Sequence, residues 1–138
     1  MSRSRVVVVA QAFKETLAAS EVAARMAAGV RAAGGEPAVV IGSDGGDGLT
    51  EALAGSLERR QQFRVTGPLG RPVEVEAGWL STDTAVFESR LACGLALLAP
   101  EERDPLVTTT RGVGEAVSRL VDAGAQRVLV GLGGSATM

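Results

Sequence analysis

The chain has no histidine and no tyrosine, and it has only one cysteine and one lysine. Without histidine, a general base must be Asp, Glu or Lys, and a His-based triad or a histidine-containing zinc site is excluded. The single Cys93 cannot form a disulfide within the chain, which is typical of a reducing compartment. We therefore expect a cytoplasmic protein whose acid–base chemistry depends on carboxylates and one lysine.

Long apolar runs and an excess of one charge are also missing. The run Val6–Ala10 has only five apolar residues, and Lys14 and Glu15 follow it closely, so neither a signal peptide nor a transmembrane segment is expected. Fourteen basic residues stand against 16 acidic ones, and no arginine-rich stripe supports nucleic-acid binding. The length suits one ordinary domain, and a small molecule is the expected partner.

Apolar periodicity predicts a β-α-β unit at the start of the chain. The β-branched run Val6–Ala10 is typical of a strand buried on both faces of a parallel sheet. A helix is expected from about residue 21 to 33, with Ser20 as its N-cap. Its apolar face would be formed by Val22, Met26 and Val30. A strand at 38–41 follows, which implies parallel strands joined by a right-handed crossover.

The middle of the chain has a different period. Between Gln61 and Glu88, three runs of alternating apolar and polar residues predict a half-exposed antiparallel excursion. Short helices are expected at 50–57 and 91–98, followed by a longer helix at 112–123 and a buried strand at 127–131.

These elements predict an α/β fold with a parallel-sheet, Rossmann- or flavodoxin-like core. Residues 1–60 would form the first part of this core, and 61–90 the β-rich excursion or the start of a second domain. Residues 91–138 would continue the α/β fold without completing it. A Gly-Gly-Ser loop after a strand normally opens a helix, so we expect the N-terminal part of a longer protein or a truncated product.

Two carboxylates and three glycines follow the second expected strand, in the run Asp44-Gly45-Gly46-Asp47-Gly48. Glycine lets the backbone approach a ligand closely, and aspartate can hold a hydroxyl, a proton or hydrated Mg²⁺. Taken alone, Asp44 and Asp47 are explained slightly better by capping or by a solvated loop. Their position favours a site, because ligands of open α/β sheets bind outside the carboxyl ends of the strands.

Other candidate segments also follow expected strands. The run Gly131-Leu132-Gly133-Gly134-Ser135 is either a phosphate cradle or only a tight turn. The hydroxyls of Thr108–Thr110 either face an anion or cap the next helix. Lys14 is either an anion ligand or simply solvated, and Glu88 with Arg90 either faces the cleft or forms a surface ion pair. The absence of a Walker lysine and of an intact Gly-x-Gly-x-x-Gly disfavours P-loop and dinucleotide folds.

Five motifs follow one another along essentially the whole chain. They are Phe13-Lys14-Glu15-Thr16-Leu17 with Ser20-Glu21-Val22-Ala23, Asp44-Gly45-Gly46-Asp47-Gly48, Val65-Thr66-Gly67-Pro68-Leu69-Gly70, Pro105-Leu106-Val107-Thr108-Thr109-Thr110-Arg111-Gly112, and Gly131-Leu132-Gly133-Gly134-Ser135-Ala136-Thr137. In order and spacing they resemble the N-terminal part of a bacterial glycerate kinase, of the family that includes the glycerate 2-kinases.

The resemblance implies transfer of the ATP γ-phosphoryl group to a hydroxyl of D-glycerate, with Mg²⁺, in the cleft of a two-domain α/β enzyme. It implies catalytic roles for Asp44 and Lys14, with Asp44 also near Mg²⁺. Residues implied to contact substrate or phosphate are Gly45, Gly46, Asp47, Arg90, Thr108, Thr109, Thr110, Gly133, Gly134 and Ser135. Such chemistry depends on positioning and charge neutralisation, which suits a site without histidine.

One departure from the family pattern lies before the Phe13-Lys14 pair. The family typically has Pro-Asp-Ser there, whereas this chain has Gln11-Ala12 and is one residue shorter. A carboxylate and a hydroxyl are thus missing from a loop expected to face the site. The alternatives to a glycerate kinase are therefore a catalytically inactive ligand-binding or regulatory module of the same fold, or a remnant with no independent role.

Overall fold

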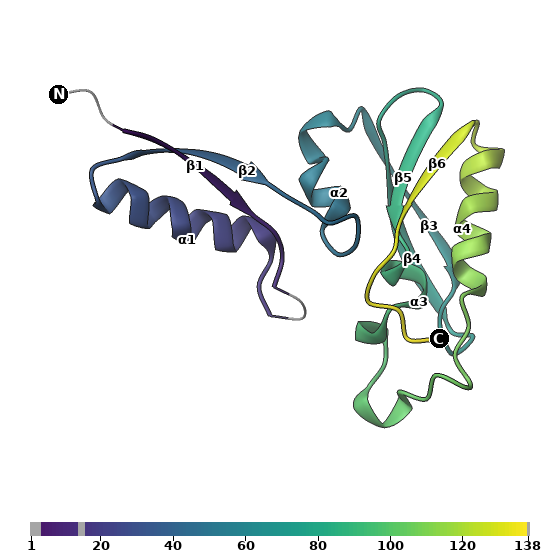
Figure 1. Cartoon of the computed structure of the whole chain (residues 1–138). Helices are drawn as coiled ribbons and strands as arrows, with labels where there is room; N and C mark the ends of the chain where they lie inside the picture. The colour runs from purple at the N-terminus through teal and green to yellow at the C-terminus, as the bar shows by residue number, and fades with distance from the viewer. Residues whose placement is uncertain (1–3, 14–15, 138) are drawn as a thin grey trace. The chain divides into compact units, whose positions relative to one another are not determined.

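The computed structural model describes residues 4–13 and 16–137. Its contacts divide the chain into two compact units, Met1–Asp44 and Gly45–Met138, which we call the first and second units. This division differs from the sequence-based boundaries near residues 60 and 90. Figure 1 shows the elements of each unit.

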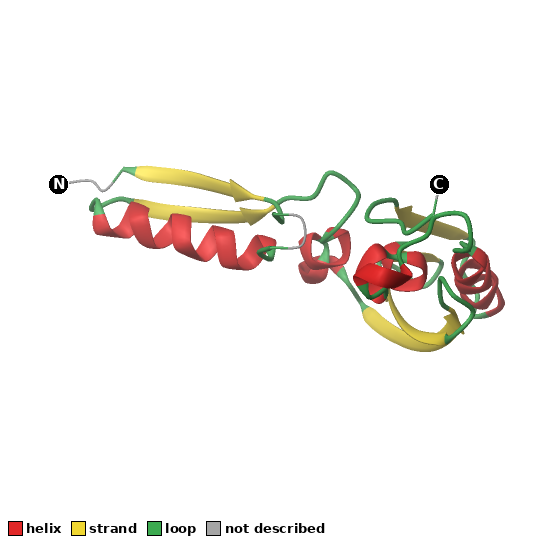
Figure 2. Ribbon diagram, turned by 90° about the horizontal axis from the view of Figure 1, so that it is seen from below, coloured by secondary structure: helices red, strands yellow, loops and turns green. Residues whose placement is uncertain are grey.

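The first unit is the β-α-β unit that the sequence predicts. Strands β1 (Arg5–Ala10) and β2 (Glu36–Ile41) pair in parallel, from Arg5 opposite Glu36 to Ala10 opposite Ile41. Helix α1 (Ala19–Ala32) connects them and lies along one face of the pair (Figure 2).

The start and the buried face of α1 differ from the prediction. Ser20 lies inside the helix, and the N-cap is Ala18, which makes no side-chain capping hydrogen bond. The buried stripe consists of alanines, Ala19, Ala23 and Ala27. Met26 is 48% exposed, because small side chains at the contact let the helix backbone approach the strands closely.

Strand β1 is buried on one face only, so the expectation of burial on both faces is wrong. Val8 and Ala10 are 2% and 6% exposed, whereas Val7 and Val9 are 66% and 60% exposed. Successive side chains of a strand point to opposite faces, and among the described residues of the first unit α1 covers only one of them.

The second unit is built on one four-stranded mixed sheet with the order β3-β4-β5-β6. Strands β3 (Arg59–Thr66), β4 (Pro72–Trp79) and β5 (Thr84–Glu88) are antiparallel, which confirms the predicted excursion. Strand β6 (Arg127–Gly131) then pairs in parallel with β5. Strands β1 and β2 form a separate two-stranded sheet, so the parallel pairs β1–β2 and β5–β6 belong to different sheets.

Helices in the second unit lie close to their predicted positions. Helix α2 (Leu49–Ala52) and a 3₁₀ turn, η1 (Ala54–Ser56), replace the helix expected at 50–57. Helix α3 (Arg90–Cys93) is followed by the 3₁₀ turns η2 (Leu95–Leu97) and η3 (Pro100–Glu102). Helix α4 (Arg111–Asp122) ends before Gly124, whose φ of 104° is typical of the predicted C′ position.

The core of the second unit lies between the sheet and the helices α3 and α4. Its largest fully buried side chains include Trp79, Phe87 and Leu120. All five residues of β5 are buried, so this strand is central rather than half-exposed. Together the two units confirm the α/β class. No helix among the described residues is long and apolar enough to span a membrane.

Candidate functional site

Two glycine-rich loops meet in the second unit. A Cβ added to Gly131 would lie 2.8 Å from the carbonyl oxygen of Gly45, and one added to Gly133 would lie 3.2 Å from Oδ1 of Asp47. Gly134 has a φ of 60°, in the left-handed region that favours glycine, and it approaches the same Asp47 oxygen. The glycines thus allow residues 45–48 and 131–134 to touch, and the structure brings five predicted site residues together. These are Gly45, Gly46, Asp47, Gly133 and Gly134.

Arg90 joins this cluster through its contact with Asp47. Its Nε lies 3.6 Å from Oδ1 of Asp47, and its Cβ lies 3.6 Å from the position of a Cβ on Gly134. The same Asp47 oxygen is buried and accepts no hydrogen bond from any described residue. A guanidinium and a carboxylate oxygen with unused capacity therefore lie beside two backbone loops, which is an arrangement able to hold an anion with its counter-cation.

A buried carboxylate, Glu88, lies under the acid-glycine loop. Its side chain is the last of β5 and is 4% exposed. Oε2 accepts hydrogen bonds from the backbone N–H of Gly48 at 3.0 Å and from Nε of Arg90 at 2.7 Å, while Oε1 accepts one from the backbone N–H of Thr50 at 3.0 Å. Burial by itself would raise the pKa of Glu88, but these three hydrogen bonds and the charge of Arg90 hold its pKa below the ordinary value.

Ser135 fixes the second glycine loop to the segment that follows α3. It forms an isolated antiparallel bridge with Gly94, and the backbone N–H of Leu95 donates to the carbonyl of Gly134 at 2.8 Å. The Cys93 thiol lies 3.9 Å from the Ser135 hydroxyl, and burial raises the pKa of that thiol. Cys93 is therefore a small buried neighbour of the loop, in a neutral thiol form at pH 7.

The three threonines before α4 serve the local structure in different ways. The Thr108 hydroxyl donates to the carbonyl of Ala136 at 2.9 Å, which ties this turn to the end of the second glycine loop. The Thr109 hydroxyl accepts from the backbone N–H of Arg111 at 3.1 Å. Thr110 is the N-cap of α4 by position, without a side-chain capping hydrogen bond. These contacts favour the structural interpretation for Thr108 and Thr109.

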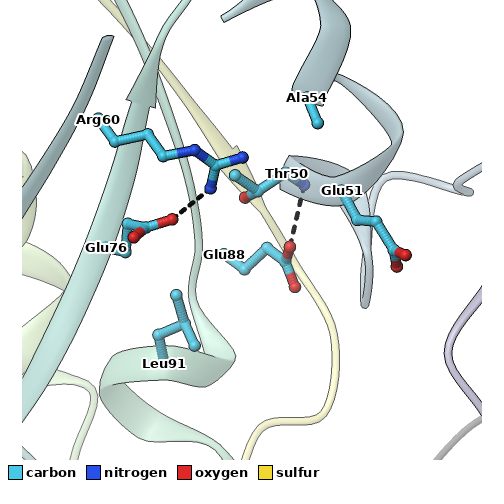
Figure 3. Close-up of a pocket in the computed structure, with 7 residues that line it drawn as sticks. All are labelled: Thr50, Glu51, Ala54, Arg60, Glu76, Glu88 and Leu91. Atoms are coloured by element: carbon cyan, nitrogen blue, oxygen red, sulfur yellow. Dashed lines mark hydrogen bonds and ion pairs between the residues drawn. The ribbon is translucent and has the colours of Figure 1, made fainter. Parts of the chain in front are cut away.

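Glu88 also lines a pocket of about 360 Å³ (Figure 3). Its lining comes from α2, η1, α3 and the strands β3 to β5, and consists of Thr50, Glu51, Ala54, Arg60, Glu76, Glu88 and Leu91. Arg60 forms an ion pair with Glu76 across one wall. The Thr50 hydroxyl is buried and has no hydrogen-bond partner among the described residues.

The two predicted catalytic residues are Asp44 and Lys14. Asp44 is exposed and is the last residue of the first unit. Lys14 lies outside the described residues. Within the described part of the chain, no group of three or more Cys, Asp or Glu side chains is arranged to hold a metal ion.

Comparison with known proteins identifies the family. The sequence profile of the Glycerate kinase family matches residues 6–138. The chain belongs to the glycerate kinase family. It is 39% identical to the glycerate kinase of Bacillus subtilis strain 168 and 40% identical to the glycerate 2-kinase of Escherichia coli K12, in each case over 96% of this chain and 36% of the relative.

A solved structure of the same family has the same fold. A crystal structure of a protein assigned as glycerate kinase 2 from Salmonella typhimurium LT2 superimposes with a TM-score of 0.72 and is 35% identical. The match covers 99% of this glycerate kinase family chain and 37% of that protein. The chain thus spans little more than a third of the length of the relatives that it matches.

Glu88 is the main residue of the site to which the prediction gave no role. The sequence left open whether Glu88 faces the cleft with Arg90 or forms a surface ion pair with it, and it did not indicate a buried anchor. The available signal was a carboxylate at the end of a mostly apolar run, Thr84–Phe87, two residues before its ion-pair partner Arg90. Sequence alone did not show that its hydrogen-bond partners are backbone groups about 40 residues earlier.

Proposed function

We propose that this chain contributes to ATP-dependent phosphorylation of D-glycerate to phosphoglycerate. The observation that carries the proposal is the meeting of two glycine-rich loops around Asp47 and Arg90 in a member of the glycerate kinase family. The relatives named glycerate kinase are about three times as long as the matched region, so the activity of the whole protein remains a proposal for this chain.

In this proposal, the residues around Arg90 bind the anionic groups of the reaction. The side chain of Arg90 is 39% exposed, and its guanidinium can pair with the carboxylate of glycerate or with a phosphate. Backbone N–H groups of Gly133, Gly134 and Ser135 would add neutral donors, as glycine loops do in other phosphate sites. Thr108 and Thr109 would act indirectly, by fixing the end of this loop.

The side chains of the candidate site supply only some of the ligands that Mg²⁺ and ATP would need. Mg²⁺ in phosphoryl-transfer sites usually takes one or two carboxylates together with phosphate oxygens and water, so a cage made wholly of protein ligands is not required. Asp47 offers a buried oxygen that accepts no hydrogen bond within the described residues. For Asp44, the same role is proposed from the family resemblance alone. Bound Mg²⁺ would neutralise the charge that develops on the transferred phosphoryl group.

The test is a coupled ADP-release assay with D-glycerate, ATP and Mg²⁺. It is run on this chain and on a chimera in which this chain replaces the matched region of the Escherichia coli relative. Turnover that depends on D-glycerate in the chimera would support the proposal, and Asp44→Asn and Arg90→Gln should each reduce it at least about 100-fold, because positioning and charge neutralisation supply most of this catalysis. The absence of turnover in a chimera that folds would contradict it.

A second candidate function is a ligand-binding or regulatory module without catalysis. The replacement of Pro-Asp-Ser by Gln11-Ala12 favours it, because that change removes a carboxylate and a hydroxyl. Restoring Pro-Asp-Ser in the chimera separates the two functions. A gain of turnover from an inactive chimera would identify the natural loop as the cause of inactivity, whereas binding of D-glycerate without turnover in both forms would favour the module.

A further inference from the structure

Glu88 occupies a place where an apolar residue would be expected. The other four residues of β5 are buried, and Glu88 itself is 3% exposed. Burying a carboxylate is costly unless hydrogen bonds and a partner charge compensate for the lost water. The chain supplies three such hydrogen bonds. The carboxylate at the end of this strand is therefore held by specific protein groups rather than by water.

The partners of Glu88 come from both parts of the candidate site. Two are the backbone N–H groups of Gly48 and Thr50, in the acid-glycine loop and the helix that it opens, each at 3.0 Å. The third is Nε of Arg90, at 2.7 Å. One buried carboxylate therefore fixes the loop backbone and the guanidinium relative to each other.

The orientation of Arg90 leaves most of its donors available. A guanidinium has five N–H groups, and here Nε is directed at Glu88 and Asp47. Within the part of the chain that the structure describes, neither Nη atom donates a hydrogen bond to the protein. A guanidinium held at Nε presents its Nη groups in a fixed direction, which suits bidentate binding of a carboxylate or a phosphate.

We propose that Glu88 is a positioning residue, which holds Arg90 and the backbone of residues 48–50 in the geometry that binds the anionic substrate. This inference rests on the proposed function for the nature of the anion, and it deepens that function by adding a residue that does not itself contact the substrate.

The positioning role and the charge of Glu88 predict opposite effects of Glu88→Gln on anion binding. Glu88 carries a negative charge close to an anion site, so its charge alone would repel a phosphate. If charge were its only effect, Glu88→Gln would tighten anion binding. If Glu88 positions Arg90, the same substitution weakens binding, because a glutamine amide cannot accept from all three donors at once.

The experiment measures binding of inorganic phosphate and of D-glycerate to the full chain by calorimetry. We expect Glu88→Gln to raise the dissociation constants at least about tenfold, as expected for loss of one charge-assisted hydrogen bond. Glu76→Gln is the matched control, because it removes the same charge from the exposed pair with Arg60 and should leave binding unchanged or slightly tighter. Unchanged or tighter binding by Glu88→Gln would overturn the proposal.

A second measurement tests the positioning without any ligand. In wild-type protein we expect slow hydrogen exchange at the amides of Gly48 and Thr50, and a resolved Arg90 Nε–H resonance in the NMR spectrum. Glu88→Gln should lose all three signatures, while Glu76→Gln keeps them. Should Glu88→Gln fail to fold, Arg90→Gln replaces it, with weakened phosphate binding but retained protection of both amides.

These two measurements separate failure of this inference from failure of the proposed function. If the wild-type chain binds neither phosphate nor D-glycerate, the proposed function fails, and the Arg90 resonance and amide exchange still decide the role of Glu88. If binding is present but the resonance and the exchange are the same in Glu88→Gln and wild type, the positioning role is wrong while the proposed function stands.

Discussion

Two buried threonines in the second unit differ in what their hydroxyls do. Thr50 and Thr84 are 9% and 8% exposed. The Thr84 hydroxyl donates to Oδ1 of Asp83 at 2.9 Å, whereas the Thr50 hydroxyl has no hydrogen-bond partner among the described residues. A buried hydroxyl without a partner lowers the stability of the folded state, because it gives up its bonds to water.

Replacing these hydroxyls by methyl groups should therefore have opposite effects. Thr50→Val should raise the free energy of unfolding by about 1 kcal/mol, since it removes an unsatisfied polar atom at nearly constant volume. Thr84→Val should lower it by about 1–2 kcal/mol, since it breaks a hydrogen bond to a carboxylate. Urea unfolding followed by the fluorescence of Trp79 measures both. A loss of stability in Thr50→Val equal to that in Thr84→Val would contradict this account.

The close approach of the two glycine loops predicts a second pair of substitutions. A Cβ at position 131 would lie 2.8 Å from a backbone oxygen, so Gly131→Ala should cost about 1–3 kcal/mol in the free energy of unfolding. Gly114, on the exposed side of α4, has no atom within 4 Å of a Cβ. Gly114→Ala should therefore stabilise the protein by about 0.5–1 kcal/mol through helix propensity. Thermal unfolding of both variants tests the prediction, and destabilisation of Gly114→Ala would refute the propensity argument.

At the scale of single residues, the residue types in the sequence identified candidate site residues, but they did not predict which of these residues contact one another. Glycine and aspartate in one short run identified the loop at 44–48, because few other residues make such a turn. The sequence could not show that Asp47 meets Gly133 and Gly134, since that contact joins residues more than 80 positions apart. Contacts of this length depend on the packing of whole elements rather than on local pattern.

At the scale of elements, one carboxylate joins α4 to the end of β3. Glu115 accepts hydrogen bonds from the backbone N–H of Thr66 at 2.7 Å and from its hydroxyl at 2.9 Å. These two bonds, with a smaller contribution from Arg111, hold the pKa of Glu115 below its ordinary value. The terminal N–H of an antiparallel strand thus finds its acceptor on a helix.

The lowered pKa sets the sign of a pH dependence. Because the unfolded chain binds the proton of Glu115 more readily than the folded chain does, its contribution to stability is present above the unfolded pKa of about 4.3. The contribution is lost as the pH falls through the lower folded pKa. Glu115→Gln should thus be less stable than wild type at pH 7, and the difference should shrink between about pH 5 and pH 3.

Urea unfolding at several pH values, followed by Trp79 fluorescence, measures this difference. The exposed Glu101 accepts no hydrogen bond from any described residue, so Glu101→Gln serves as the control and should match wild type at each pH. A constant difference between Glu115→Gln and wild type from pH 7 to pH 3 would show that the carboxylate charge is not involved.

The periodicity of the sequence predicted well where the helices lie along the chain. It did not predict which of their residues are buried. Helix α4 begins one residue before its predicted start and ends one residue before its predicted end, because its apolar spacing and Gly124 are both strong local signals. For α1, Ser20 suggested a cap that the structure does not use, since the helix begins two residues earlier than predicted, at Ala19. The larger apolar side chains of α1 suggested its buried face, but alanines form the contact with the strands.

At the scale of the whole molecule, the sequence predicted the α/β class but not the separation into two sheets. Val6–Ala10 and Arg127–Gly131 are both apolar strand runs, and nothing local assigns them to different sheets. Which strands pair is decided by long-range packing, such as the burial of Trp79 and Phe87 under α4. The half-buried state of β1 follows from the same cause, because a strand pair covered by one helix keeps a second face.

The two units should differ in stability. Among the described residues of the first unit, the buried hydrophobic side chains are those of one valine, Val8, and of four alanines, Ala10, Ala19, Ala23 and Ala27. The second unit buries Trp79, Phe87 and Leu120 completely. Since each buried methylene contributes roughly 0.8 kcal/mol, the first unit gains much less from burial per residue that it orders.

Unfolding in urea should therefore show two transitions. Trp79 is the only tryptophan and reports on the second unit, whereas circular dichroism at 222 nm also reports on α1 of the first unit. We expect part of the dichroism to be lost at lower urea than the fluorescence change, because non-coincident probes reveal units that unfold separately. Ala24→Gly, at an exposed position of α1, should shift only the first transition, by about 1 kcal/mol of helix propensity. Coincident transitions in wild type, shifted together by Ala24→Gly, would instead show that the two units fold as one cooperative structure.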